Sequence, residues 1–233
     1  MERHLFWPNR SFVAFDTETT GLDFDNDRII QAAIAVFVKG QHVWSFDWLL
    51  NTKRESEPEA VAIHNITDEQ RWKEGEDSLP VMQHLIALFR RSIRANCPVV
   101  AFNSPFDFTM FRREIARFHL DFDMDGLHII DPLVLDRHFQ KNVPVFTAPY
   151  MRQCEMAARY GLSIPTHDAL QDAICAGNIA LAQSIHYSGI RNVSPLELER
   201  KQLAWHDEFK VKVENFARRK NIQFSIPQWP FGD

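Results

Sequence analysis

Hydrophobic residues in the first fifty positions form short apolar runs that are separated by polar turns. Residues 12–15 are a compact apolar run, and residues 29–38 are rich in Ile, Val and Ala. A turn at Lys39-Gly40-Gln41 leads into residues 42–50, where Val, Trp and Phe stand in strand-like sequence. The pattern therefore predicts a meander of three antiparallel strands.

The remaining chain alternates between helical and strand patterns. Apolar residues at helical spacing predict a helix that begins at Ser78 and runs past Phe89, and further helices at residues 104–118, 150–160, 168–186 and 195–220. Short buried strands are expected at residues 98–102 and 127–131. Strands first and helix–strand alternation afterwards indicate an α/β domain with a mixed sheet.

The last part of the chain differs in composition from the part before it. Residues 187–193 are interpreted as a linker, followed by one charged helix and a tail that contains Pro and Trp. The predicted division is a main domain at residues 1–186 and a C-terminal helix and tail at residues 187–233. The helix has one apolar stripe, which favours packing on the main domain and leaves partner binding as the alternative.

The composition is that of an ordinary globular protein. The 233 residues are 45% hydrophobic and 24% charged, which excludes a disordered chain and a collagen-like fibre. No apolar run approaches ~18 residues, so no membrane span is predicted. The first residues do not resemble a signal peptide, and the three cysteines show no pairing pattern. Reduced thiols and a cytoplasmic location are the expectation.

Acidic residues follow the predicted strands at three places. Asp16 and Glu18 end the first strand and project from the same face, because strand side chains alternate. Asp107 falls in the first turn of the helix that follows residues 98–102. Asp172 lies in the first turns of the helix at residues 168–186, and His167 is expected in the loop before it.

Each segment alone has a structural explanation. A D-x-E triplet can be a solvated strand end, an acid in the first helical turn is favoured by the helix dipole, and Asp168 is expected to be an N-cap. Together, the four carboxylates form a set of hard oxygen donors that suits Mg²⁺ or Mn²⁺ rather than structural zinc. His167 supplies an imidazole that can accept a proton near neutral pH. This combination is typical of two-metal hydrolysis of a phosphodiester.

The net charge of −5 argues, at first sight, against a nucleic-acid ligand. Four of the negative charges, however, belong to the candidate metal ligands, and two bound divalent cations would offset them. The net charge therefore does not decide the ligand class.

Several segments resemble motifs of the DnaQ-like DEDDh 3′–5′ exonucleases. These are FDTETTGL at residues 15–22, VAFN at residues 100–103 with the following Phe106 and Asp107, HDALQD at residues 167–172, IHNIT at residues 63–67, and DPL at residues 131–133. The resemblance covers about residues 10–186. Phe102 stands where family members often have histidine, and Asn65 stands where glycine is commoner.

The resemblance implies a ribonuclease H-like fold: a central mixed sheet of five strands flanked by helices, here with a C-terminal helical extension. It implies two divalent cations, Mg²⁺ or Mn²⁺, with Asp16 bridging both. Glu18 and Asp172 would complete the coordination of the first ion, and Asp107 would hold the second ion. His167 would be the general base. The expected pocket for the 3′-terminal nucleotide consists of Thr17, Thr19, Gly21, Leu22, His64, Asn103 and Phe106.

The expected substrate is the 3′ end of a single-stranded nucleic acid, with DNA favoured over RNA because the FDTETTGL and IHNIT segments look more like proofreading and repair members. The alternatives are an exoribonuclease of the same chemistry and a non-catalytic, polymerase-associated module. A haloacid-dehalogenase-like phosphatase is disfavoured, because that chemistry needs a second aspartate where Glu18 stands. Proofreading, repair and nucleotide recycling stay open, and a polymerase or other replication protein is the expected partner.

Overall fold

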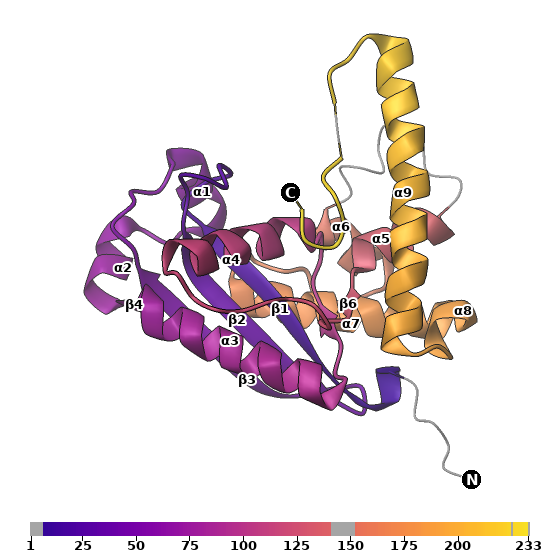
Figure 1. Ribbon diagram of the computed structural model, residues 1–233, viewed down its shortest axis with the longest axis horizontal. Helices are drawn as coiled ribbons and strands as arrows, with labels where there is room; N and C mark the ends of the chain where they lie inside the picture. Colours follow the sequence, from indigo (N-terminus) through magenta and orange to yellow (C-terminus); the bar gives the residue numbers. More distant parts are fainter. Residues whose placement is uncertain (1–6, 141–151, 225, 233) are drawn as a thin grey trace.

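The computed structural model describes residues 7–140, 152–224 and 226–232 (Figure 1). Strands and helices alternate along the chain much as the hydrophobic pattern predicts. In order, they are η1 Trp7–Asn9, β1 Ser11–Thr19, β2 Ile29–Val38, β3 Gln41–Asn51, α1 Pro58–His64, α2 Asp68–Glu74, β4 Glu76–Asp77, α3 Ser78–Ala95, β5 Val99–Val100, α4 Pro105–Arg117, β6 Ile129–Ile130, α5 Pro132–Phe139, α6 Gln153–Arg159, α7 Ala169–His186, α8 Ser188–Arg191 and α9 Pro195–Lys220.

The strands form one mixed sheet in the order β4-β3-β2-β1-β5-β6. The antiparallel meander of β1, β2 and β3 is confirmed, and β5 and β6 run parallel to β1. The five expected strands are therefore present. The sixth is the two-residue β4, which pairs in parallel with the end of β3 just before α3 begins.

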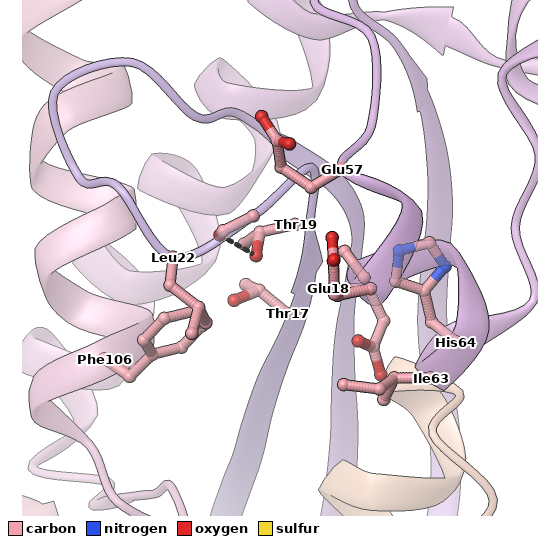
Figure 2. A pocket seen from close by; sticks show the side chains of 11 residues that line it. Thr17, Glu18, Thr19, Leu22, Glu57, Ile63, His64 and Phe106 are labelled. Carbon is pink, nitrogen blue, oxygen red and sulfur yellow. Dashed lines mark hydrogen bonds between the residues drawn. The ribbon is translucent and has the colours of Figure 1, made fainter.

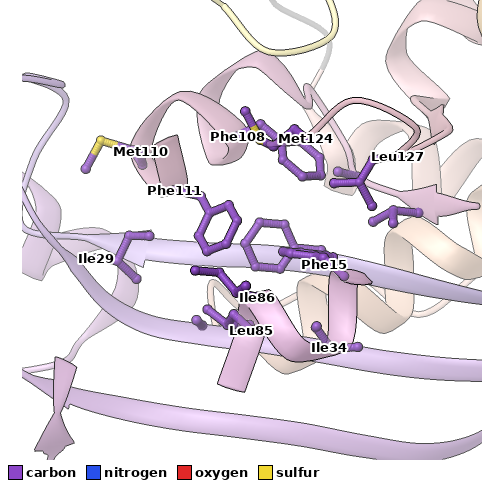
Figure 3. Close-up of a cluster of buried hydrophobic side chains, with 14 of the residues drawn as sticks. Phe15, Ile29, Ile34, Leu85, Ile86, Phe108, Met110, Phe111, Met124 and Leu127 are labelled. Carbon is purple, nitrogen blue, oxygen red and sulfur yellow. The ribbon is translucent and has the colours of Figure 1, made fainter. Parts of the chain in front are cut away.

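Each face of the sheet is covered by helices (Figure 1). The side chains of β1 alternate between the two faces. Phe15 packs with Phe89 of α3 and with Phe108 and Phe111 of α4 in the larger core (Figure 3). Phe12 and Ala14 lie on the opposite face, with the alanines of α7. The helical spacing of the α4 phenylalanines thus serves core packing.

Some elements differ from the sequence-based expectation. The helices α1 and α2 have only seven residues each, which is too short for a periodic pattern to show. The segment interpreted as a linker contains the helix α8, whose Ile190 is buried and accepts a hydrogen bond from the Trp7 indole at 2.8 Å. The first residues of the helix expected at 150–160 lie outside the described part of the chain.

The helix α9 stands at the β6 end of the molecule and packs against α5 and β6 (Figure 1). Beyond α9, the chain turns back toward α4. Among the described residues, no helix is both long and apolar enough to cross a membrane.

Candidate active site

The alternation along β1 also decides where its polar end points. Asp16 and Glu18 continue the face of Phe12 and Ala14, which is the face that α7 covers. Thr17 continues the opposite face, which α4 covers. The end of β1 therefore presents carboxylates to α7 and a hydroxyl to α4.

Asp172 meets these carboxylates from the first turn of α7. Ligand atoms of Asp16, Glu18 and Asp172 all lie within 4.8 Å of one another. Asp168 is the N-cap of α7, and its side chain accepts a hydrogen bond from the Gln171 N–H at 3.0 Å, as expected. His167 precedes this cap in the loop and is exposed, with a left-handed φ of 55°.

Gln31 holds the start of α7 against the sheet. It lies opposite Glu18 in the register of β1 and β2. Its amide oxygen accepts a hydrogen bond from the Ala169 N–H at 3.1 Å, and its amide nitrogen donates to Asp168 at 3.1 Å and to Asp47 at 3.1 Å. The sequence gives no motif for Gln31, yet this buried amide fixes the helix that carries Asp172.

Asp107 reaches the site from the first turn of α4. Its Oδ1 accepts hydrogen bonds from the Thr17 backbone N–H at 3.0 Å and from the Thr17 hydroxyl at 2.7 Å. Asp107 is not one of the three residues that lie within 4.8 Å of one another, but it lines the same cavity. The four carboxylates thus converge from β1, α4 and α7.

Burial raises the pKa of every carboxyl group in this cluster. The pKa of Glu18 rises to about 8 and that of Asp172 to about 6, in both cases mainly through burial, with like charges nearby adding to the rise. Burial raises the pKa of Asp107 to about 7 against the opposing Thr17 hydrogen bonds. The pKa of Asp16 is raised well above its ordinary value by burial and by Asp107, Asp172 and Glu18.

A cluster of this kind fits divalent cations. The donors are carboxylate oxygens with no cysteine sulfur among the ligands, and such oxygens suit Mg²⁺ or Mn²⁺. The Oδ1 atom of Asp172 is buried and has no hydrogen-bond partner among the described residues. An unpaired buried acceptor is costly, and a cation at this point would satisfy it and relieve the repulsion.

Two neighbouring cavities meet at the end of β1. The carboxylates, His167 and Asn103 line a cavity of about 330 Å³. The other cavity, of about 350 Å³, is lined by the remaining members of the predicted nucleotide pocket: Thr17, Thr19, Gly21, Leu22, His64 and Phe106 (Figure 2). Thr17, Glu18 and Phe106 line both cavities, so a molecule in one cavity can reach the carboxylates in the other.

Leu22 and Phe106 lie next to each other on one side of the second cavity, and Ile63 and His64 of α1 lie on the other side (Figure 2). Leu22 is 80% exposed although its loop is tightly held. The buried Asp27 accepts hydrogen bonds from the Thr20 hydroxyl at 2.8 Å and from the Asp23 N–H at 2.8 Å. Asp27 also passes so close to Gly21 that a β-carbon there would clash with its carboxylate.

Asn65, one of the two residues that depart from the family motifs, ends α1 in a left-handed conformation with a φ of 59°. Glycine adopts this conformation most easily, and asparagine is among the few other residues that adopt it routinely. The departure therefore preserves the turn. The neighbouring His64 is buried, which lowers its pKa, and its Nδ1 accepts the Ile66 N–H at 3.0 Å.

Some cavity residues belong to none of the motifs found in the sequence. Arg152, Gln153 and Cys154 line the carboxylate cavity, and Gln153 donates a hydrogen bond to the Asp172 backbone carbonyl at 2.7 Å. Glu57 and Ala60 line the second cavity because they belong to, or directly precede, α1. Pro58 at the first position of α1 is a helix-start signal that could have located them.

The chain matches the family model of the RNase_T exonucleases over residues 13–180, which is more than half of its length. It belongs to this exonuclease family. The matched region includes all four carboxylates and His167. The resemblance to DnaQ-like exonucleases is thereby confirmed.

Two curated relatives carry the name of DNA polymerase III subunit epsilon or of a protein like it. The chain is 29% identical over 178 residues to a DNA polymerase III subunit epsilon-like protein of Rhodobacter capsulatus, covering 73% of this chain and 23% of the relative. It is 31% identical over 106 residues to DNA polymerase III subunit epsilon of Treponema pallidum, covering 46% of each. The chain thus spans about a quarter and about half of these two relatives.

Solved structures of Exonuclease I share the fold of this RNase_T family member. The enzyme of Methylocaldum szegediense aligns with a TM-score of 0.63 at 21% identity, covering 78% of this chain and 42% of that one. Escherichia coli Exonuclease I in complex with a dA16 oligonucleotide aligns with a TM-score of 0.65 at 18% identity, with the same coverage. The ribonuclease H-like fold expected from the motifs is confirmed.

Proposed function

We propose that this protein is a 3′–5′ exonuclease that hydrolyses the terminal phosphodiester of single-stranded DNA and releases nucleoside 5′-monophosphates. One observation carries the proposal: four carboxylates and His167 surround a cavity that adjoins a second cavity of nucleotide size. The chemistry of the first cavity suits a phosphodiester and the shape of the second suits the terminal nucleoside.

The carboxylates would hold two divalent cations, Mg²⁺ or Mn²⁺. Asp16 is central to the cluster and would contact both ions, Glu18 and Asp172 would complete the site of the first, and Asp107 would hold the second. When bound, such ions stabilise the negative charge on the attacking and leaving oxygens. The carboxylates compensate the ionic charge, and Thr17 keeps Asp107 in place through two hydrogen bonds.

His167 would accept the proton of the attacking water at an imidazole nitrogen. It lies in an exposed loop directly before the Asp168 cap, at the rim of the carboxylate cavity. In this position the ring reaches solvent, which can take the proton away after each turnover. Catalytic hydrogen bonds of this kind commonly tighten only when substrate is bound.

The second cavity would receive the 3′-terminal nucleoside. Leu22 and Phe106 provide apolar surface for the base, and stacking on an aromatic ring tolerates every base. The loop that carries Leu22 is fixed by Asp27, so the wall is preformed. A terminal base in this cavity is unpaired, which favours single-stranded ends.

DNA as the substrate and a replication enzyme as the partner are supported by the relatives. The curated relatives carry DNA polymerase III epsilon names, and the Escherichia coli Exonuclease I structure contains an oligonucleotide. The negative net charge is compatible with this substrate once two cations offset the carboxylates.

Single-stranded DNA labelled at the 5′ end, incubated with Mg²⁺ or Mn²⁺, should give a ladder that shortens by one nucleotide at a time. The same strand labelled at the 3′ end should release labelled mononucleotide at once, and EDTA should stop both reactions. A matched RNA strand and a blunt duplex should be degraded more slowly. Faster digestion of RNA than of DNA would indicate an exoribonuclease instead. No shortening of any strand would indicate a non-catalytic module.

Replacing His167 with alanine should lower the turnover number by about 10²–10⁴-fold, because the water then lacks a proton acceptor. Binding of Mn²⁺, measured by calorimetry, should stay near the wild-type affinity, since the carboxylates are unchanged. His186 at the C-terminal end of α7 is a matched control, and its alanine variant should keep full activity. Normal turnover by the His167 variant would remove this residue from the mechanism.

A further inference from the structure

A buried carboxylate that the proposed reaction does not use lies at the start of α4. Asp131 follows β6 and is 1% exposed. Its Oδ1 accepts hydrogen bonds from the backbone N–H groups of Asn103 at 3.0 Å and Leu133 at 2.9 Å. Its Oδ2 accepts the Ser104 N–H at 3.0 Å and the indole N–H of Trp229 at 3.2 Å. One side chain thus joins β6, the start of α4 and the chain beyond α9.

Residues 226–232, here called the C-terminal strap, run along α4 beyond this point. Three side chains of the α4 segment donate hydrogen bonds to successive carbonyl groups of the strap: Ser104 to Pro230 at 3.1 Å, Thr109 to Phe231 at 2.7 Å and Arg112 to Gly232 at 3.2 Å. These donors span about two helical turns. The strap therefore follows the first two thirds of α4.

The contact between the strap and α4 is close. The ring of Phe231 packs edge-on against Phe108 with a centroid distance of 5.4 Å. A β-carbon on Gly232 would clash with the Thr109 hydroxyl, and Gly232 has a φ of 65°. Only glycine meets both demands without strain.

The helix α9 contacts both Asp131 and the start of the strap. Gln202 is fully buried, accepts the Asp131 backbone N–H at 2.8 Å and donates to the Ile129 carbonyl at 2.8 Å. His206, one turn further along α9, donates to the Pro227 carbonyl at 3.0 Å. The strap is therefore held between α9 and α4, with Asp131 at the junction.

These contacts concern the active site because of where α4 begins. Asp107 is the third residue of α4, and Asp131 binds the N–H groups of the two residues directly before the helix. The other restraint on the Asp107 carboxylate is its pair of hydrogen bonds from Thr17. A shift of the start of α4 would therefore move Asp107 relative to the carboxylates on β1 and α7.

We propose that the C-terminal strap positions Asp107 for divalent-ion binding, with Trp229 as the positioning residue that connects the strap to Asp131. The proposal rests on the proposed function, in which Asp107 holds one of the ions. Residues behind a metal ligand orient it, and their loss typically lowers metal affinity or activity by about 10–100-fold.

The test compares two phenylalanine variants, each of which loses one buried indole hydrogen bond. Trp229→Phe removes the bond to Asp131, and Trp7→Phe removes the bond to the Ile190 carbonyl at the other end of the sheet. Both should lower the melting temperature to a similar extent. Only Trp229→Phe should weaken Mn²⁺ binding, measured by calorimetry without substrate, by about tenfold, and lower the turnover number by a comparable factor.

A second comparison separates positioning from general destabilisation. In an Asp107→Asn background, Trp229→Phe should have little further effect on Mn²⁺ affinity, because the ligand that it positions is already lost. Ser104→Ala removes the bond to Pro230 alone and should weaken Mn²⁺ binding in the same direction, so it carries the test if Trp229→Phe does not fold. Wild-type Mn²⁺ affinity in both Trp229→Phe and Ser104→Ala would overturn the proposal. A protein that binds Mn²⁺ and cleaves no strand would instead refute the proposed function, and the affinity comparison would still decide the role of the strap.

Discussion

Asp16→Asn should lower the exonuclease turnover number by at least about 10³-fold and leave the fold intact. Asp16 lies at the centre of the carboxylate cluster, and its pKa is raised by burial and by four neighbouring carboxylates. The change keeps the size of the side chain and removes the charge that would bind both cations. The measurement is the initial rate on single-stranded DNA at saturating Mg²⁺.

Asp121→Asn makes the same chemical change at an exposed loop carboxylate and should keep the wild-type rate. Without metal, Asp16→Asn should melt at or above the wild-type temperature, because it removes one source of repulsion inside the cluster. Full activity of Asp16→Asn would show that the reaction does not depend on this cluster. A variant that is inactive and also unfolded would shift the explanation to stability.

The metal-free protein should lose stability as the pH rises from about 5 to about 8. In the folded state the pKa values are about 8 for Glu18, about 7 for Asp107 and about 6 for Asp172, against ordinary values of 4.5 for glutamate and 3.8 for aspartate. Over this range these three carboxyl groups bind more protons in the folded state than in the unfolded state, so their contribution to the free energy of unfolding falls with rising pH. Below the ordinary values both states are protonated, and the penalty is absent.

Divalent cations should reverse this loss where the carboxyl groups are ionised. Added Mn²⁺ should raise the melting temperature by about 5 °C or more at about pH 8 and much less at about pH 5, where protons compete for the same oxygens. Scanning fluorimetry with EDTA and with Mn²⁺ across the pH range measures both effects. Glu18→Gln should flatten the metal-free pH dependence. A melting temperature that rises with pH in EDTA, and that Mn²⁺ leaves unchanged, would contradict the cation site.

The main features of the site could be predicted because they follow from local rules. Alternation along β1 places Asp16 and Glu18 together, and the pattern at residues 165–172 separates the loop residue His167 from the helix cap Asp168. The phenylalanines Phe108 and Phe111, which recur at helical spacing in α4, are buried in the core. Each of these inferences needed only a few consecutive residues.

The features that the sequence did not reveal depend on contacts between distant segments. The Trp229–Asp131 hydrogen bond joins residues 98 positions apart, and the bond from Gln31 to Ala169 joins residues 138 positions apart. Trp229 and Gln31 belong to no recognised motif, and the partner of each is set by tertiary packing. The division of the chain near residue 187 stays a prediction, as do the individual roles of the site residues.

The alternation along β1 has a consequence for how this strand can evolve. Phe15 and Thr17 lie on the face of the sheet that α4 covers, while Ala14, Asp16 and Glu18 lie on the face that α7 covers. An insertion or deletion of one residue before Asp16 would exchange the two sides for every residue between the change and the strand end. Natural variants of this strand should therefore tolerate substitutions among apolar residues and keep an invariant length.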